Sequence, residues 1–291
     1  MSFESQRKEI ISICKNLLDE GKASLILGFA DGQTGNGSAP FFIRSGDEAD
    51  GLKWDDTCTT TLAKYLLEKK EGTAIIAKPC DARAIVMYMS ENKIERNKVY
   101  IIGVECSGMK DKNGLPAPGC EDCTFNTPPI YDVLVKNDIS RKTAAGNCNA
   151  ETGYSDKFER FRKEVEKCIL CYSCRQACYG CYCETCFIDR NMPNWLPNQL
   201  DTGAKMVYHL GRAMHLAGRC VECGACERTC PSGVNIRYLV KDLADFCKEL
   251  YGYMPGENPD DIPAMTTFDK NDREIGFMGG EHDDSCCDSK G

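Results

Sequence analysis

The sequence lacks several features that would assign it to common classes of protein. No segment approaches the roughly 20 consecutive apolar residues of a membrane-spanning helix, so we expect no membrane span. Acidic residues outnumber basic ones, 44 to 36, and the net charge of −8 argues against general nucleic-acid binding, which needs a concentrated basic surface. The N-terminal segment carries charges throughout and has no apolar stretch suited to a signal peptide. We therefore expect a reducing, cytoplasmic environment.

Motifs of common enzymes are also missing. The glycines of Gly32-x2-Gly35-x-Gly37 do not follow the G-x-G-x-x-G order of a dinucleotide-binding turn, and neither a P-loop nor an H-E-x-x-H motif occurs. Only three histidines are present. His209 and His215 flank Arg212 on one expected helix, where solvated or packing roles are favoured over metal binding. The sequence therefore indicates no catalytic residue.

Cysteine, in contrast, is abundant. The 21 cysteines favour either a disulfide framework or a metal protein. Disulfide frameworks are typical of short secreted chains with small cores. This chain has 291 residues, 42% of them hydrophobic, which is enough for a real core without covalent links. We therefore interpret the cysteines as thiolate ligands.

Two four-cysteine runs share the spacing C-x2-C-x2-C-x3-C. The first contains Cys168, Cys171, Cys174 and Cys178, and the second contains Cys220, Cys223, Cys226 and Cys230. In bacterial two-cluster ferredoxins the fourth cysteine of such a run completes the other cluster. We therefore predict two 4Fe-4S clusters, one on Cys168, Cys171, Cys174 and Cys230, and one on Cys178, Cys220, Cys223 and Cys226. Zinc sites more commonly use paired C-x2-C knuckles.

Further cysteines suggest additional centres. A third 4Fe-4S cluster is predicted on four cysteines that each stand beside a loop signal, Cys80, Cys106, Cys120 and Cys123. A fourth is hypothesised on Cys58, Cys181, Cys183 and Cys186. Zinc on the C-x-C-x2-C part, or free thiols, are the alternatives. For Cys80 a nucleophilic role is a further alternative, because Asp81 can cap a helix that would begin there and a helix N-terminus stabilises a thiolate.

The remaining pattern predicts two domains and a tail. Residues 1–136 alternate strands with helices, which predicts an α/β domain with a mostly parallel sheet. Its expected strands are 23–30, 40–44, 73–77, 98–104 and 131–135, and its expected helices are 5–20, 59–70 and 81–92. A polar linker, 137–154, precedes a mainly helical domain with two ferredoxin-type 4Fe-4S clusters, 155–254. Its helices are expected at 155–167, 202–218 and 235–253, and 255–291 is expected to be an extended tail.

Several stretches make the chain resemble known families. LLDEGKASLILG, AKPCDARAIVMYM, VYIIGVECSGM and GCEDCTFNTPPIYDVLV resemble the beta-subunit family of deazaflavin (coenzyme F420)-reducing hydrogenases and formate dehydrogenases. The family's G-x-PC corresponds to Ala77-Lys78-Pro79-Cys80, and its C-x-G to Cys106-Ser107-Gly108. The later cysteine segments are similar to ferredoxin-type subunits that accompany heterodisulfide-reductase-like complexes. Together these resemblances cover most of residues 5–255.

The resemblance implies an electron-transfer subunit that is not itself catalytic. Its expected partners are a formate dehydrogenase or hydrogenase catalytic subunit and a heterodisulfide-reductase-like flavoprotein in an anaerobic redox complex. Members of the beta-subunit family carry FAD, so FAD is an implied cofactor; without it the chain would be a relay of clusters alone. Two alternatives stay open. One is a flavin-dependent oxidoreductase that exchanges electrons with deazaflavin or NAD(P)H, and the other is a redox-sensing or assembly protein.

Overall fold

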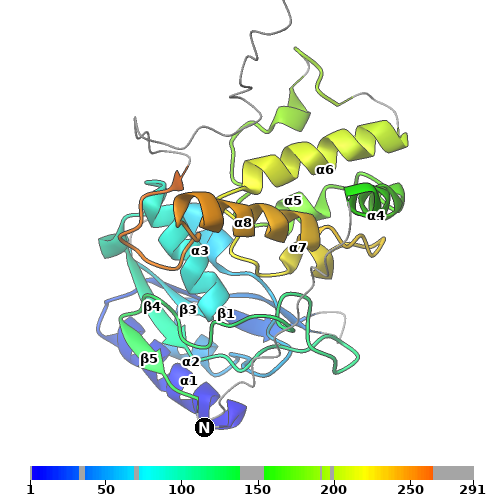
Figure 1. Cartoon of the computed structure of the whole chain (residues 1–291). Helices are drawn as coiled ribbons and strands as arrows, with labels where there is room; N and C mark the ends of the chain where they lie inside the picture. The colour runs from blue at the N-terminus through cyan, green and yellow to red at the C-terminus, as the bar shows by residue number, and fades with distance from the viewer. Residues whose placement is uncertain are drawn as a thin grey trace, which may run out of the picture.

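A computed structural model describes residues 2–32, 37–68, 72–137, 154–190, 192–196 and 200–264. The expected linker lies almost entirely outside these residues, as do most of the expected tail and Cys148, Cys286 and Cys287. Figure 1 shows a sheet flanked by helices at one end of the molecule and a group of helices at the other. Among the described residues, no helix is long and apolar enough to cross a membrane.

The N-terminal half is built on a five-stranded sheet of order β2-β1-β3-β4-β5. Its strands are β1 (Leu25–Asp31), β2 (Ser38–Ile43), β3 (Thr73–Ala77), β4 (Val99–Val104) and β5 (Val133–Val135). Only the β1–β2 pair is antiparallel; β1–β3, β3–β4 and β4–β5 are parallel. The prediction of a mostly parallel sheet is thus confirmed. All five residues of β3 are buried, because a central parallel strand is covered on both faces and therefore needs a continuous apolar run.

Helices cover both faces of the sheet. They are α1 (Phe3–Asp19), α2 (Gly46–Ala49) and α3 (Pro79–Ser90), with short 3-10 helices η1 (Ala63–Glu68) and η2 (Arg96–Lys98). Figure 1 shows α3 between the sheet and the C-terminal helices, with α1 on the opposite side. Ile10, Cys14 and Leu17 of α1 are buried at intervals of three or four residues, as expected for a helix that packs by one stripe.

One expected helix is shorter and tighter than predicted. Residues 59–70 were expected to form an α-helix, but the structure has the 3-10 helix η1 over Ala63–Glu68. The backbone N–H groups of Leu62 and Ala63 donate to the Asp81 carboxylate at 2.8 and 3.2 Å. That carboxylate belongs to α3, so the start of this segment is fixed by a partner distant in the sequence.

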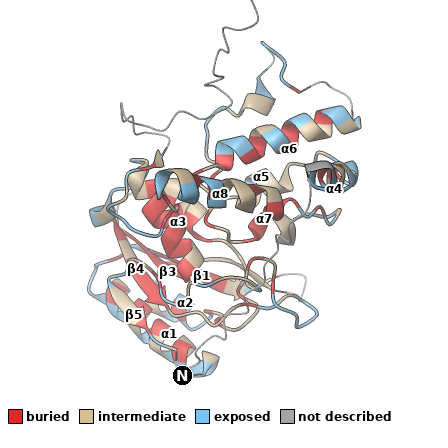
Figure 2. Cartoon of the chain, viewed as in Figure 1, coloured by how far each residue is buried: buried red, intermediate tan, exposed pale blue. Residues whose placement is uncertain are grey.

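The C-terminal half is mainly helical. Its helices are α4 (Tyr154–Glu166), α5 (Ser173–Ala177), η3 (Phe187–Asp189), α6 (Thr202–Leu216), α7 (Ala225–Arg228) and α8 (Arg237–Tyr251). Tyr179 and Val221, from the loops of this half, are buried in the same hydrophobic cluster as the sheet. Figure 2 shows continuous burial from the sheet through α3 to this junction, whereas the outer side of α6 is exposed. The domain boundaries stay a prediction, but the cores of the two halves are joined.

Backbone approaches very closely at the junction. Gly224 has φ 70°, and a Cβ atom there would lie 1.9 Å from the carbonyl oxygen of Pro118. Gly119 on the facing loop has φ 84°, and its Cβ would lie 2.7 Å from the backbone of Cys223 and Gly224. Only glycine allows both the left-handed conformation and the contact. The two halves are therefore seated backbone against backbone at this point.

We predict that Gly224→Ala lowers the free energy of unfolding by more than about 3 kcal/mol, because backbone strain and a steric clash add. Gly114→Ala is the matched control, since Gly114 has a similar φ of 78° but open space around it. The control should lose only about 1 kcal/mol from strain. Denaturant unfolding of both variants measures this, and equal losses would show that the close approach is not required.

Candidate functional site

Two loops in the C-terminal half have the same backbone shape. Leu170 and Tyr172 in the first run have φ values of 52° and 60°, and Glu222 and Gly224 at the matching positions of the second have 56° and 70°. In each loop the N–H two residues after the first cysteine donates to its sulfur, at 3.3 Å from Leu170 to Cys168 and 3.4 Å from Glu222 to Cys220. Left-handed non-glycine residues cost about 1–3 kcal/mol each and tend to cluster at functional sites. The repeated loop therefore marks a candidate site.

The first thiol group combines both runs. Cys168, Cys171, Cys174 and Cys230 line one cavity together with Cys226. Burial raises the pKa of Cys168, and the nearby thiols of Cys174, Cys230 and Cys171 raise it further. Val234 donates its N–H to the Cys230 sulfur at 3.3 Å. The structure thus brings Cys230 to the three cysteines of the other run.

The second thiol group also combines cysteines of both runs. Burial raises the pKa of Cys220 well above its usual value, and Cys178, Cys223 and Cys226 add to this effect. Cys178, from the first run, therefore lies with the three leading cysteines of the second. This is the crossed grouping that the spacing predicts. Four thiols with N–H donors on tight loops form a donor set that fits a cubane cluster; the binding of iron stays a prediction.

A third group lies in the N-terminal half at the junction. Cys80, Cys106, Cys120 and Cys123 line a cavity of about 120 Å³, and Cys223 of the second group lines the same cavity. Gly108, with φ 104°, donates its N–H to the Cys106 sulfur at 3.4 Å. Lys78, Arg83, Arg228 and Lys241 also line the cavity and outnumber its two carboxylates, Asp122 and Glu222, so that cations partly offset the charge that four thiolates would bring. The four cysteines that the sequence grouped are thus brought together.

The nucleophile alternative for Cys80 finds no support. Burial raises the pKa of its thiol well above the usual value, and Asp81 raises it further, whereas an activated cysteine has a lowered pKa. The expectation that Asp81 caps α3 is wrong. The N-cap is Lys78, without a side-chain capping bond, and Asp81 instead accepts from the backbone before η1.

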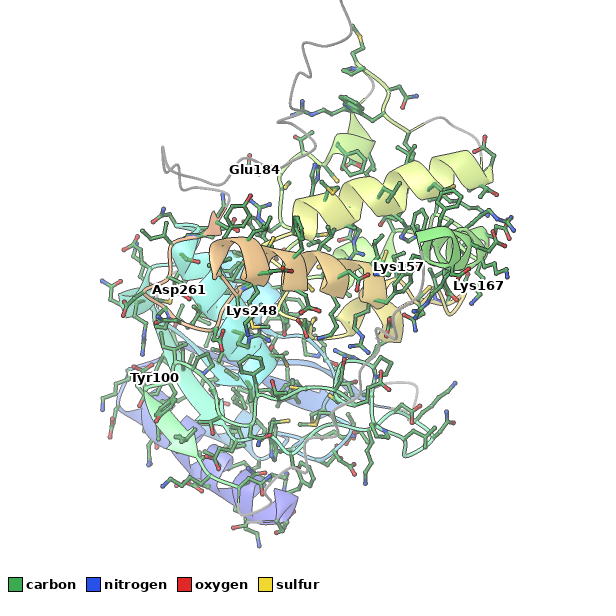
Figure 3. The ribbon with its side chains drawn as sticks, in the orientation of Figure 1. Tyr100, Lys157, Lys167, Glu184, Lys248 and Asp261 are labelled. Atoms are coloured by element: carbon green, nitrogen blue, oxygen red, sulfur yellow. The ribbon has the colours of Figure 1, made fainter. Side chains whose placement is uncertain are left out.

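The hypothesised fourth group is only partly assembled. Cys181, Cys183 and Cys186 line a cavity of about 300 Å³. Glu184, labelled in Figure 3, lies on the same segment beside one end of α6. Cys58 is not part of this cavity. It is fully buried in the core of the sheet, where its thiol donates to the Lys53 carbonyl at 3.8 Å, so grouping it with the other three was wrong.

A site for a single metal ion needs its ligands closer together than a cluster does. In the part of the chain that the structure describes, no three His, Cys, Asp or Glu side chains are arranged to hold one metal ion. A cubane takes each thiolate on a different iron and so spaces its ligands more widely than one tetrahedral zinc does.

The inner side of α6 faces the thiol groups. The Tyr208 hydroxyl lies 3.3 Å from the Cys174 sulfur, and Arg212 donates to the Cys174 carbonyl at 3.2 Å. His209 is buried, and burial followed by the Arg212 charge lowers its pKa to about 4, so it is neutral near pH 7. His215 is exposed and packs edge-on against Phe187. The packing and solvated roles expected for the two histidines agree with these positions.

A buried polar network that the sequence did not predict joins the halves. Asp81 is fully buried and pairs with Lys78 at 3.0 Å, while the Tyr179 hydroxyl donates to its other carboxylate oxygen. Tyr88 in turn donates to the Tyr179 carbonyl at 2.9 Å. Tyr179 directly follows the last cysteine of the first run, whereas Pro231 directly follows the last cysteine of the second run. That difference is the only local feature of the sequence that singles out Tyr179, and it carries no information about the contact with Asp81.

Arginines complete the junction. Arg83 donates to the carbonyls of Val221 and Pro255 at 2.9 and 3.0 Å. Arg228 donates to the carbonyls of Pro118, Thr59 and Cys223. Arg237 forms ion pairs with Glu121 at 2.7 Å, Asp122 at 2.8 Å and Glu227 at 3.3 Å. Both loops of cysteines at the junction are thereby tied to the opposite half.

Comparison with known proteins gives two informative relatives, although no family model matches the chain. The F420-dependent formate dehydrogenase subunit beta of Methanocaldococcus jannaschii is 22% identical, over 90% of this chain and 94% of that protein. The F420-dependent formate dehydrogenase 1 subunit beta of Methanococcus maripaludis is 21% identical, over 88% and 92%. The similarity spans nearly the full length of both relatives. It supports the beta-subunit family to which the N-terminal motifs pointed.

We predict that Asp81→Asn lowers the free energy of unfolding by about 3–5 kcal/mol, because it removes the carboxylate that pairs with the buried Lys78 ammonium. Asp50→Asn is the control, since its ion pair with Lys15 is largely exposed. That variant should lose less than about 1 kcal/mol. Denaturant unfolding compares them, and a loss for Asp81→Asn as small as that of the control would contradict the role assigned to the buried pair.

Proposed function

We propose that the chain is an iron–sulfur electron-transfer subunit of a cytoplasmic redox complex. One observation carries the proposal: the thiol groups form an unbroken row. Cys226 of the second group lines the cavity of the first, and Cys223 of the second lines the cavity of the third. Clusters in these groups would be neighbours from the C-terminal helices to the edge of the sheet. Such an arrangement suits passage of single electrons.

The proposed assignments follow the groups. One 4Fe-4S cluster is held by Cys168, Cys171, Cys174 and Cys230, a second by Cys178, Cys220, Cys223 and Cys226, and a third by Cys80, Cys106, Cys120 and Cys123. Each cluster changes charge by one electron, with a potential set by burial, hydrogen bonds to sulfur and local charge. Cys181, Cys183 and Cys186, without Cys58, form an additional candidate site for an iron–sulfur centre, since no three side chains of the described residues are arranged to hold a single zinc ion.

The partners are inferred from the relatives. Both are named as beta subunits of F420-dependent formate dehydrogenases, so a catalytic subunit of formate dehydrogenase or hydrogenase is the proposed neighbour on one side. On the other side we propose a heterodisulfide-reductase-like flavoprotein, from the likeness of the C-terminal cysteine segments to ferredoxin-type subunits. The chain would relay electrons between the two.

A second candidate function is favoured by the cavity of about 300 Å³. Besides three cysteines it is lined by the aromatic side chains of Tyr182 and Phe187 and by the cations Lys64 and Arg219. Aromatic walls with a few placed charges are typical of cofactor sites. A flavin bound there, FAD in the first instance, would allow electron exchange with deazaflavin or NAD(P)H. Flavin released from anaerobically purified protein, together with turnover using either donor, would favour this function over a pure relay.

We predict that anaerobically purified protein contains about twelve irons and as much sulfide, if the three proposed clusters are present. Cys120→Ala should lower the iron content by about four, because it removes one ligand of the third cluster. Cys247→Ala is the control, a buried cysteine that lines none of the three thiol groups and should leave iron unchanged. About eight irons in the unmodified protein would contradict the third cluster. Zinc in the purified protein, without a cubane EPR signal, would contradict the proposed function.

A further inference from the structure

Arg212 is a buried cation at the centre of the C-terminal half. It lies on the inner side of α6 and is 4% exposed. One guanidinium nitrogen donates to the Cys174 carbonyl at 3.2 Å, and Nε has no hydrogen-bond partner. Among the described residues, no carboxylate forms an ion pair with it. Burying a charge without a counter-ion is costly, so a negative partner is expected beside it.

Cysteines lie beside it instead. Arg212 donates to the backbone of Cys174, in the first group, and lines one cavity with Cys181. The next residue along α6, Ala213, lies in a buried cluster against which Cys178 and Cys220 of the second group pack. The buried guanidinium therefore lies beside both ferredoxin-type groups.

A fixed cation favours the more negative state of whatever lies beside it. Reduction adds one negative charge to a cluster, and local charge is among the factors that set its potential. The Coulomb term is large here because the surroundings are buried, and it is only weakly screened by salt. Arginine also keeps its charge at every working pH. The effect would therefore be constant across pH.

We propose that Arg212 tunes the potentials of the clusters: its buried charge raises the reduction potentials of both ferredoxin-type clusters together. The inference rests on the proposed function, because it needs clusters in the two thiol groups. It goes further by assigning the setting of their potentials to one residue that binds no iron. A purely structural role, donation to the Cys174 carbonyl, would be met by any side chain with an N–H donor.

The test compares three variants of the full chain, purified anaerobically. Arg212→Gln keeps an N–H donor and removes the charge, and Arg212→Lys keeps the charge. Lys163→Met removes one cation from the solvent side of α4, where the side chain is 66% exposed. Iron content and thermal unfolding report on assembly and folding. EPR-monitored redox titration reports the midpoint potential of each cluster signal.

We expect Arg212→Gln to retain its iron and to shift both cluster potentials to lower values, while Arg212→Lys and Lys163→Met stay close to the unmodified protein. Full iron with unchanged potentials in Arg212→Gln would overturn the inference and leave the proposed function intact. So would loss of iron in Arg212→Gln alone, since Arg212 would then be needed for assembly. Absence of cubane signals from the unmodified protein would instead overturn the proposed function, and this inference with it.

Discussion

Each of the two cysteine runs ends on a residue that belongs to the other group. In the first run the short helix α5 carries the chain from Cys174 to Cys178, and in the second α7 leads from Cys226 towards Cys230. The two helices pack against each other, so the last thiol of each run reaches the loop of its partner. Neither group is complete unless both loops are docked. The left-handed residues repeated in both loops, and the packing of α6 against them, hold the two loops in this crossed arrangement.

The crossing in turn depends on the sheet. Gly224 of the second loop touches the backbone of Pro118, immediately before the loop that carries Cys120 and Cys123. Arg228 binds carbonyls on both sides of that contact, and Arg237 pairs with the acidic residues between the two cysteines. Buried and half-buried charges of this kind contribute little net stability, but they penalise any displacement that leaves one unpaired. Their effect is to fix the distance between the second and third thiol groups, which an electron would cross in the proposed relay.

Much of this organisation could be predicted from local sequence. The strands predicted at 73–77 and 98–104 were recognised as short apolar runs, and the helices predicted at 202–218 and 235–253 by their apolar periodicity; the structure places those helices at Thr202–Leu216 and Arg237–Tyr251. The spacing of the cysteine runs predicted their crossed grouping, because in ferredoxins with this spacing the first three cysteines of a run bind one cluster and the fourth binds the other.

What sequence could not supply was pairing across long separations. Cys58 was grouped with three distant cysteines because nothing local distinguishes a core thiol from a ligand, and the structure buries it beside the sheet. The Asp81 carboxylate was expected to cap its own helix and instead accepts a hydrogen bond from the hydroxyl of Tyr179, 98 residues away. The sequence did not predict a place for Arg212 beside the thiol groups, because the cysteines of the two runs meet only in the folded chain.

The crossed grouping is tested most directly by single ligand substitutions followed by EPR of the reduced protein. We predict that Cys178→Ser alters the same cluster signal as Cys220→Ser, and that Cys230→Ser alters the same signal as Cys168→Ser. If Cys178→Ser instead reproduced Cys168→Ser, each run would hold its own cluster, and the interlocked arrangement described here would be wrong.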